Sequence, residues 1–267
     1  MTDYEHLLVK HEGETVRITM NRPERRNALS EGHLRELLDA FEAAGRSEAT
    51  GIVLAAEGKA FSAGHDFADV AARDLAGVRD LLRLCTSLMH TIQDVPQVVI
   101  ARVQGAALGG GLGLVCVSDI AVAGYSASFG LPEAQLGLAP ALISPYVLAR
   151  LGFTRTRELM LTGVRFDYLA AHNWGLIQHY CADFELDARV RAVLRDVLRA
   201  APEALRACKE LLFTVAAGGD TLDYRAALLE RLRTGEEARL GATAFLQKQP
   251  APWAIERIDD FDDVEDA

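Results

Sequence analysis

The sequence predicts an α/β protein in which a parallel-sheet core is followed by a helical C-terminal region. Two short β-branched runs, Gly51–Ala55 and Gln97–Val103, are typical of buried parallel strands. The segment between them carries an apolar stripe at helical spacing, formed by Leu81, Leu84, Cys85, Leu88 and Ile92. After Pro145 the pattern is almost entirely helical. Alternating strands and helices followed by a run of helices indicate this architecture.

The first elements are predicted from alternation and capping. Leu7–Val9 and Thr15–Met20 alternate apolar and polar residues around Gly13, which predicts an opening hairpin. Ser30 can cap a helix that continues to Ala44. Asp119–Ala123 predicts a further strand. The segments with helical spacing after Pro145 are Val147–Leu151, Thr156–Leu161, Tyr168–Trp174, Leu186–Ala201, Glu203–Val215 and Leu222–Leu246.

With 267 residues the chain fits one large domain with an extension. We expect a core over 1–200, a helical region over 201–255 and an acidic tail over 256–267, which holds seven acids and one Arg. The net charge of −10 argues against nucleic-acid or membrane-surface partners. The start of the chain is too charged for a signal peptide, and Gly105–Ser118 is too short and glycine-rich to span a membrane.

The cysteines and histidines suggest neither disulfides nor a metal site. Cys85, Cys116, Cys181 and Cys208 have no CxxC spacing and lie in apolar surroundings, which predicts buried free thiols in a reducing, cytoplasmic environment. The seven histidines form no metal-binding motif, so no metal is expected.

Two glycine-containing segments follow predicted strands. The first, Ala60–Asp66, has the sequence AFSAGHD, and the second, Gln104–Gly113, has the sequence QGAALGGGLG. Three consecutive glycines before a helix have two explanations of equal weight: main-chain N–H groups aimed at an anion or oxyanion, or a crossing too tight for side chains. The second segment matches neither a P-loop nor a dinucleotide-binding fingerprint.

A third segment, Ser128–Leu138, contains Glu133, the only carboxylate between Asp119 and Glu158. Taken alone, a Glu after a Pro is most often a solvated residue at a helix start. The joint order of the motifs is more informative. These motifs are RPERRNAL, GKAFSAGHD, QGAALGGGLGL, SDIAVA, FGLPEAQLGL and AFLQKQPAPW.

Together these motifs resemble the crotonase superfamily, the enoyl-CoA hydratase and isomerase family, over about residues 5–253. The resemblance implies a spiral of ββα units and C-terminal helices that assemble a homotrimer or homohexamer. It also implies an acyl-CoA thioester as substrate, in fatty acid metabolism, with no cofactor beyond the coenzyme A of the substrate. The N–H groups of His65 and Gly110 would hold an enolate oxyanion. We expect the His65 imidazole to support the site or face CoA rather than act as a general base.

The same resemblance suggests how CoA is held. Adenine would meet the main chain near Ala63, and phosphates would meet basic residues of the RPERR loop or the C-terminal helix. The substrate-binding residues implied are Arg25, Arg26, Ala63, Gly64, Gly109, Gly111 and Lys248.

Glu133 matches the second of two family glutamates, whereas Gly113 stands where the first would be. We therefore expect Glu133 to transfer the proton, in an apolar pocket of Phe129, Leu131, Leu138 and Leu142 that raises its pKa. The resemblance favours a hydratase of the methylglutaconyl-CoA hydratase-like branch, with another group positioning the water. A Δ3-Δ2 isomerase, which needs one acid/base, and a non-catalytic acyl-CoA-binding protein remain open.

Overall fold

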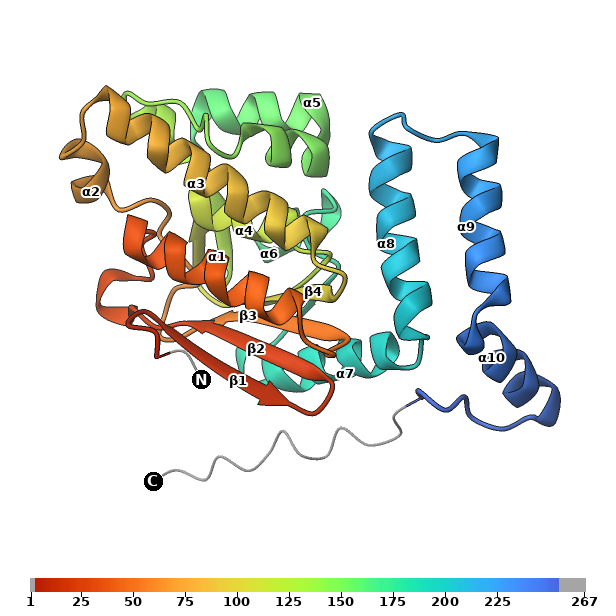
Figure 1. Ribbon diagram of the computed structural model, residues 1–267. Helices are drawn as coiled ribbons and strands as arrows, with labels where there is room; N and C mark the ends of the chain where they lie inside the picture. Colours follow the sequence, from red (N-terminus) through yellow and green to blue (C-terminus); the bar gives the residue numbers. More distant parts are fainter. Residues whose placement is uncertain (1–2, 255–267) are drawn as a thin grey trace.

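The computed structural model describes residues 3–254, and its centre is a six-stranded sheet in the order β1-β2-β3-β4-β6-β9 (Figure 1). Its strands are β1 (Leu7–Glu12), β2 (Thr15–Met20), β3 (Gly51–Ala56), β4 (Val98–Val103), β6 (Ile120–Gly124) and β9 (His179–Cys181). The β1–β2 pair is the predicted antiparallel hairpin, and the other pairs are parallel. The predicted α/β class is therefore confirmed.

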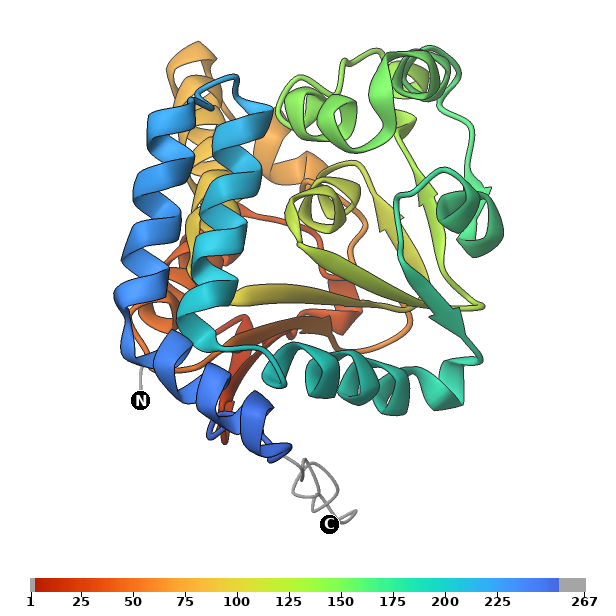
Figure 2. The same ribbon diagram turned by 90° about the vertical axis from the view of Figure 1, so that its right-hand side faces the viewer.

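Helices cover both faces of this sheet. One face carries α1 (Glu31–Gly45), α3 (Leu75–Asp94) and α4 (Gly110–Val117), and their apolar residues share one core with the strands. The other face is covered by α7 (Leu186–Leu198), which packs on side chains of β3, β4 and β6 (Figure 2). The predicted cap of α1 is present, because the side chain of Ser30 accepts a hydrogen bond from the main-chain N–H of His33.

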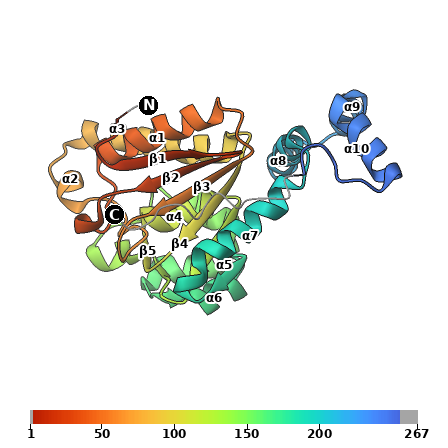
Figure 3. The ribbon, with the colours of Figure 1, turned by 90° about the horizontal axis from the view of Figure 1, so that it is seen from below.

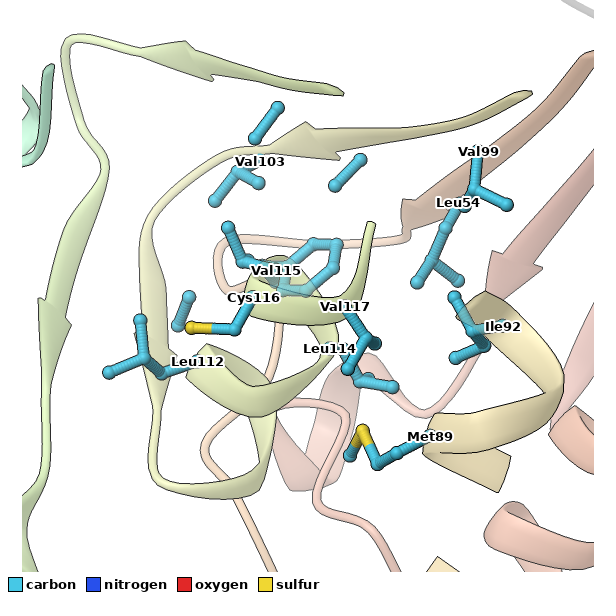
Figure 4. Close-up of a cluster of buried hydrophobic side chains, with 14 of the residues drawn as sticks. Leu54, Met89, Ile92, Val99, Val103, Leu112, Leu114, Val115, Cys116 and Val117 are labelled. Carbon is cyan, nitrogen blue, oxygen red and sulfur yellow. The ribbon is translucent and has the colours of Figure 1, made fainter. Parts of the chain in front are cut away.

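Helix α4 lies inside the molecule rather than on its surface. All eight of its residues are buried, and its apolar side chains face those of Leu54, Met89 and Val103 from the neighbouring elements (Figure 4). A helix that is apolar on every side is stable only where it is surrounded by protein. The N-terminus of α4, which begins with the glycine run, is thereby held in a fixed place.

A second, three-stranded sheet extends from the main one. It consists of β5 (Ala106–Leu108), β7 (Ser128–Gly130) and β8 (Phe166–Asp167), with β5 and β7 parallel. The remaining elements of the core are η1 (Pro23–Arg25), α2 (Phe67–Ala71), η2 (Pro132–Leu136), α5 (Ser144–Thr162), α6 (Tyr168–Asn173) and η3 (Asp183–Glu185). The sequence did not predict β5, β7, β8 or β9.

Three C-terminal helices stand beside the core, as the view from below shows (Figure 3). They are α8 (Pro202–Ala216), α9 (Leu222–Thr234) and α10 (Glu236–Gln247). The expected continuous helix over Leu222–Leu246 is wrong, because Gly235 takes an extended conformation and separates α9 from α10. The division of the chain near residue 200 stays a prediction, and the acidic tail over 256–267 lies outside the described residues.

One buried ion pair attaches α8 to the core. The ammonium group of Lys209 lies 2.7 Å from Oδ2 of Asp119 and donates to the main-chain carbonyl of Gln97 at 3.0 Å. The same carboxylate oxygen accepts the N–H of Val99, the second residue of β4. One charged side chain from the helical region thus meets the sheet where β4 and β6 begin.

The structure also bears on two further questions raised by the sequence, membrane-spanning helices and the burial of the cysteines. No helix over residues 3–254 is both long and apolar enough to cross a membrane. Cys85 and Cys116 are buried free thiols as predicted, whereas Cys181 is only half-buried and Cys208 is exposed, so burial of all four was wrong.

Candidate active site

The small sheet brings the three singled-out segments together. Ser62, in the first segment, bridges to Ala107 of β5, and β5 pairs along its length with β7. The N–H of Gly109 donates to the carbonyl of Gly130 at 3.0 Å. Gly130 is the last residue of β7 and comes shortly before Glu133 in the chain. Each segment follows a buried strand, so the sheets fix all three at one edge.

The glycines stand where the first and second segments touch. Gly64 has φ +91°, and a Cβ there would lie 2.8 Å from the carbonyl oxygen of Leu108 and 3.4 Å from the nitrogen of Gly110. At Gly111 a Cβ would lie 2.7 Å from the carbonyl oxygen of Ser62. Contacts this short with main-chain atoms exclude any side chain. The explanation of the glycines as a tight crossing is therefore correct.

The same crossing leaves two main-chain donors unused. The N–H of Gly110 is in the first turn of α4 and has no helical acceptor. The N–H of His65 lies between two bridging hydrogen bonds, from Leu29 to Gly64 and from Asp66 to Leu29, and takes part in neither. Within residues 3–254 neither donor has a partner. The tight crossing is compatible with the other explanation, in which these N–H groups bind an anion or oxyanion, and that explanation stays a prediction.

A pocket of about 230 Å³ is lined by His65 and by Gly109, the residue before Gly110. Its polar side chains are Glu133 and His65, and the rest of its wall is apolar or main chain. The residues lining it are Ala63, Gly64, His65, Val70, Val78, Leu81, Leu82, Gly109, Pro132, Glu133, Leu136, Leu138, Ala139, Pro140, Ala141, Leu142 and Ile143. Leu138 and Leu142 are there as expected, whereas Phe129 and Leu131 are fully buried in the core behind it.

Glu133 lies against the start of the glycine run. A Cβ on Gly109 would be 2.7 Å from Oε1 of Glu133, and Oε2 is buried without a hydrogen-bond partner in the described residues. Burial raises the pKa of Glu133 above its ordinary value, opposed by its own main-chain N–H. A carboxyl group held this way is suited to proton transfer near neutral pH.

The imidazole of His65 lies against the next glycine of the run, Gly110. A Cβ on Gly110 would be 2.8 Å from its Cε1 and 2.9 Å from its Nδ1. Burial lowers the pKa of His65 to about 4, with Asp69 acting in the opposite direction. The ring is therefore neutral at pH 7, and it lines the pocket instead of facing outward.

The residues expected to hold CoA are only partly brought together. The N–H of Ala63 donates to the carbonyl of Arg26 at 2.9 Å, so the RPERR loop adjoins the first segment. Arg25 and Arg26 are exposed there, and neither has an ion pair among the described residues. Lys248 follows α10, is exposed and does not line the pocket of its own chain.

Two residues that line the pocket from α3 were not predicted from the sequence. Val78 and Leu82 lie on α3 beside, not within, the buried stripe that predicted this helix. The two residues are four positions apart and therefore share one face of the helix, and this spacing is the feature of the sequence that could have identified them.

The neighbouring helix α2 is held in place by Arg73. Its guanidinium group forms ion pairs with the carboxylates of Glu31 and Asp69, each at 2.7 Å.

One group of possible metal ligands is present in the described part of the chain. It consists of Glu5, His6 and Glu36, none of which lines the pocket. The carboxylate of Glu36 already accepts the main-chain N–H groups of Glu5 and His6, at 3.0 Å and 2.8 Å. These contacts explain why the three residues lie together.

Comparison with known proteins gives consistent matches. Residues 10–256 match the family model described as enoyl-CoA hydratase/isomerase. Enoyl-CoA hydratase ACTT6 of Alternaria alternata is 36% identical over 74% of this chain and 66% of its own. The 2,3-dehydroadipyl-CoA hydratase of Escherichia coli is 31% identical over 91% of this chain and 96% of its own. The structure of Pseudomonas aeruginosa AtuE covers 94% of this chain and all of its own, at 39% identity and a TM-score of 0.91.

Proposed function

Because the chain belongs to the enoyl-CoA hydratase/isomerase family, we propose that it is an enzyme that adds water to the double bond of a 2-enoyl-CoA. The observation that carries this proposal is the placement of Glu133 beside two free main-chain donors, those of His65 and Gly110. Acyl-CoA chemistry of this kind needs an oxyanion site and a proton-transfer group in contact with one carbon chain.

In the proposed reaction the thioester carbonyl accepts the N–H groups of His65 and Gly110. Polarisation of this carbonyl draws electrons from the conjugated double bond, so the oxygen of a water molecule bonds to Cβ while Glu133 takes a proton from it. The enolate formed is held by the two donors, each worth roughly 2.7–4 kcal/mol in comparable sites. Glu133 then returns the proton to Cα, which completes the addition of one water.

The apolar wall supports a short or branched hydrocarbon acyl group. Val78, Leu82, Leu136 and Ile143 line the pocket together with Glu133, and among the residues that the structure describes no Lys or Arg lines it. A branched enoyl-CoA fits such a space, whereas a free carboxylate on the acyl chain would be desolvated there without a partner. This lining favours a hydrocarbon chain over the diacid substrate of the methylglutaconyl-CoA branch.

The CoA moiety is proposed to extend from the pocket across the first segment. The main chain of Ala63, Gly64 and Gly109 lines the pocket and can contact CoA directly. Gly111, which was expected among these residues, is buried against Ser62 and does not line the pocket. The exposed guanidinium groups of Arg25 and Arg26 adjoin Ala63 and can meet phosphates. Lys248 would contribute from a neighbouring subunit, since it lies away from the pocket of its own chain.

That arrangement requires assembly, and a homotrimer or homohexamer in the cytoplasm is part of the proposal. The three C-terminal helices expose several large apolar side chains in the single chain. They include Leu212, Leu222, Leu229, Phe245 and Leu246, from 66% to 83% exposed. Surfaces of this kind mark interfaces. Light scattering should give a mass of three or six chains, and a stable monomer would contradict the assembly.

A second reaction is favoured by a separate observation. Glu133 is the only carboxylate lining the described pocket, and moving a proton between the α and γ carbons of a 3-enoyl-CoA needs one such group. Incubation with crotonyl-CoA, 3-methylglutaconyl-CoA and a 3-enoyl-CoA, with products identified by mass, separates the candidates. A gain of one water supports hydration, and conversion of the 3-enoyl-CoA at constant mass supports isomerisation. Binding without turnover of any of the three supports a non-catalytic protein.

A further inference from the structure

Helix α4 has the N–H of Gly110 at one end and a cation at the other. Arg150 of α5 donates from Nη1 to the main-chain carbonyl of Ser118 at 3.3 Å, and Ser118 is the C-cap residue of α4. A helix has a partial positive charge at its N-terminus and a partial negative charge at its C-terminus. The guanidinium group therefore lies at the negative end of the helix whose positive end contains Gly110.

The other hydrogen bonds of Arg150 also go to uncharged oxygens. Nε and Nη2 donate to the main-chain carbonyl of Leu176 at 3.2 Å and 3.1 Å, and Nη2 donates to Oε1 of Gln178 at 3.1 Å. No carboxylate within residues 3–254 forms an ion pair with this guanidinium group. Burial lowers the pKa of Arg150, yet a guanidinium group stays protonated at neutral pH.

The ionisable groups near Arg150 do not cancel its charge. Asp119 and Cys116 both favour the protonated form of Arg150. The carboxylate of Asp119 is already paired with Lys209 at 2.7 Å. Burial raises the pKa of Cys116 to about 12, so this thiol is neutral at pH 7. These four residues hold two cations and one carboxylate, which leaves one positive charge at the C-terminal end of α4.

The interior of the protein separates this charge from the Gly110 N–H. The eight residues of α4 span about 12 Å, and a hydrogen bond at each end adds about 3 Å. All eight residues are buried, so the intervening space contains protein and not bulk water. At an effective dielectric constant of about 20, a unit charge at about 18 Å changes the pKa of an acid by about 0.7.

We propose that Arg150 is a positioning residue for the oxyanion site, which fixes the C-terminal end of α4 and raises the positive potential at the Gly110 N–H. This inference rests on the proposed function, in which that N–H binds the enolate oxygen. The same side chain ties α4 to the sheet, because Oε1 of Gln178 also accepts the N–H of Ala121 in β6 at 2.8 Å. The enolate is thus stabilised by a cation that it does not contact.

Two substitutions remove the net charge in different ways. Arg150→Gln deletes the cation and part of its hydrogen bonding. Gln178→Glu keeps an acceptor oxygen for Arg150 and for the main chain of β6, and it gives Arg150 a carboxylate partner. Arg150→Lys keeps the charge without the planar group. Arg155→Gln is the control on the same helix, since Glu158 already neutralises that cation at 2.6 Å.

The main measurement is the pH at which bound acetoacetyl-CoA ionises to its enolate, followed by the ultraviolet absorbance of the enolate. Butyryl-CoA does not ionise in the accessible pH range, so its affinity reports binding alone. The unfolding temperature reports the stability of each variant. Hydration of crotonyl-CoA is assayed in parallel.

Both variants that remove the net charge should weaken the enolate. Arg150→Gln and Gln178→Glu should each raise the pKa of bound acetoacetyl-CoA by about 0.7 and lower kcat for hydration about fivefold, with butyryl-CoA affinity changed less than about twofold. Arg150→Lys and Arg155→Gln should remain close to the wild type in the pKa of the bound ligand. An unchanged pKa in Gln178→Glu would overturn the proposal, even if Arg150→Gln does not fold.

The proposed function can fail separately from this inference. If the wild type favours the enolate of acetoacetyl-CoA but hydrates no enoyl-CoA, the hydratase proposal is wrong, and the same variants still decide the role of Arg150. If the wild type does not lower the pKa of bound acetoacetyl-CoA, neither the oxyanion site nor the role of Arg150 stands.

Discussion

Ile143 occupies the space that a side chain at position 113 would need. Its Cγ2 would be 2.5 Å from a Cβ on Gly113, and this contact joins α4 to the segment that begins α5. The glycine is therefore a packing requirement, and the pocket has one carboxylate for a structural reason.

We predict that Gly113→Glu will not improve hydration of crotonyl-CoA and will lower the free energy of unfolding by at least about 1–3 kcal/mol, the usual effect of overpacking. The measurement is urea denaturation together with the hydration assay. Gly113→Glu combined with Ile143→Ala makes room for the side chain and should recover part of the stability. A stable and more active single variant would contradict the contact described.

Glu133→Gln tests the proton-transfer group. It should lower kcat by about 10²–10⁴-fold and leave acetoacetyl-CoA affinity nearly unchanged, because the amide is similar in shape but transfers no proton. Gln135, two residues away and exposed, provides a control in Gln135→Glu. Unchanged turnover in Glu133→Gln would remove Glu133 from the mechanism even if the reaction proved correct.

The same substitution should make the protein more stable at neutral pH. Burial raises the pKa of Glu133, so the native state binds this proton more tightly than the unfolded state, and native stability falls as pH rises between the two pKa values. The Gln variant has no carboxyl group to ionise, so its native stability does not fall for this reason. Its unfolding temperature should exceed that of the wild type at pH 7, with the difference shrinking as pH approaches 4.5. A difference in unfolding temperature that stays constant with pH would mean that ionisation of Glu133 is not its cause.

His33 and His65 should give the opposite pH dependence. Burial lowers the pKa of each ring to about 4, so the stability gained from keeping them neutral is fully present above pH 6.5 and is lost as pH falls towards 4. Replacing His65 by Gln should remove about one proton from the slope of unfolding free energy against pH in this window. An unchanged slope would show that His65 is not titrating there.

Lys209→Met tests the attachment of α8. Removing one partner of a buried ion pair typically costs about 3–5 kcal/mol, since Asp119 is left without its cation. Arg83, which pairs with Asp80 on the exposed side of α3, is the matched control, and Arg83→Met should change the unfolding temperature little. Equal effects of the two substitutions would contradict the anchoring role of Lys209.

The elements predicted correctly are those whose signal is local. Ser30 at the start of α1 and the β-branched run of β3 needed no tertiary information. The strands β5 and β7 have three residues each, which is too few for an alternating pattern. They pair with each other because the rest of the fold holds their segments side by side. The break at Gly235 was missed because the apolar spacing continues across it.

The roles given to the site residues stay predictions, and the shape of the pocket they share was not predicted. Glu133, His65 and Gly110 were singled out by their motifs, yet nothing in the sequence indicated that the carboxylate lies over Gly109 and the imidazole over Gly110. Nor could it show that Ile143 closes position 113. Both facts depend on the distance between segments that are far apart in the chain.

The two unused N–H donors belong to the main chain, and their position is fixed by glycine contacts and by the pairing of β5 with β7. Substitution of a side chain at position 65 or 133 therefore leaves these two N–H groups in place. Under the proposed function, the acid or base could change by a single substitution while the main chain continued to bind the enolate. What such a change would preserve is a geometry set by the main chain alone.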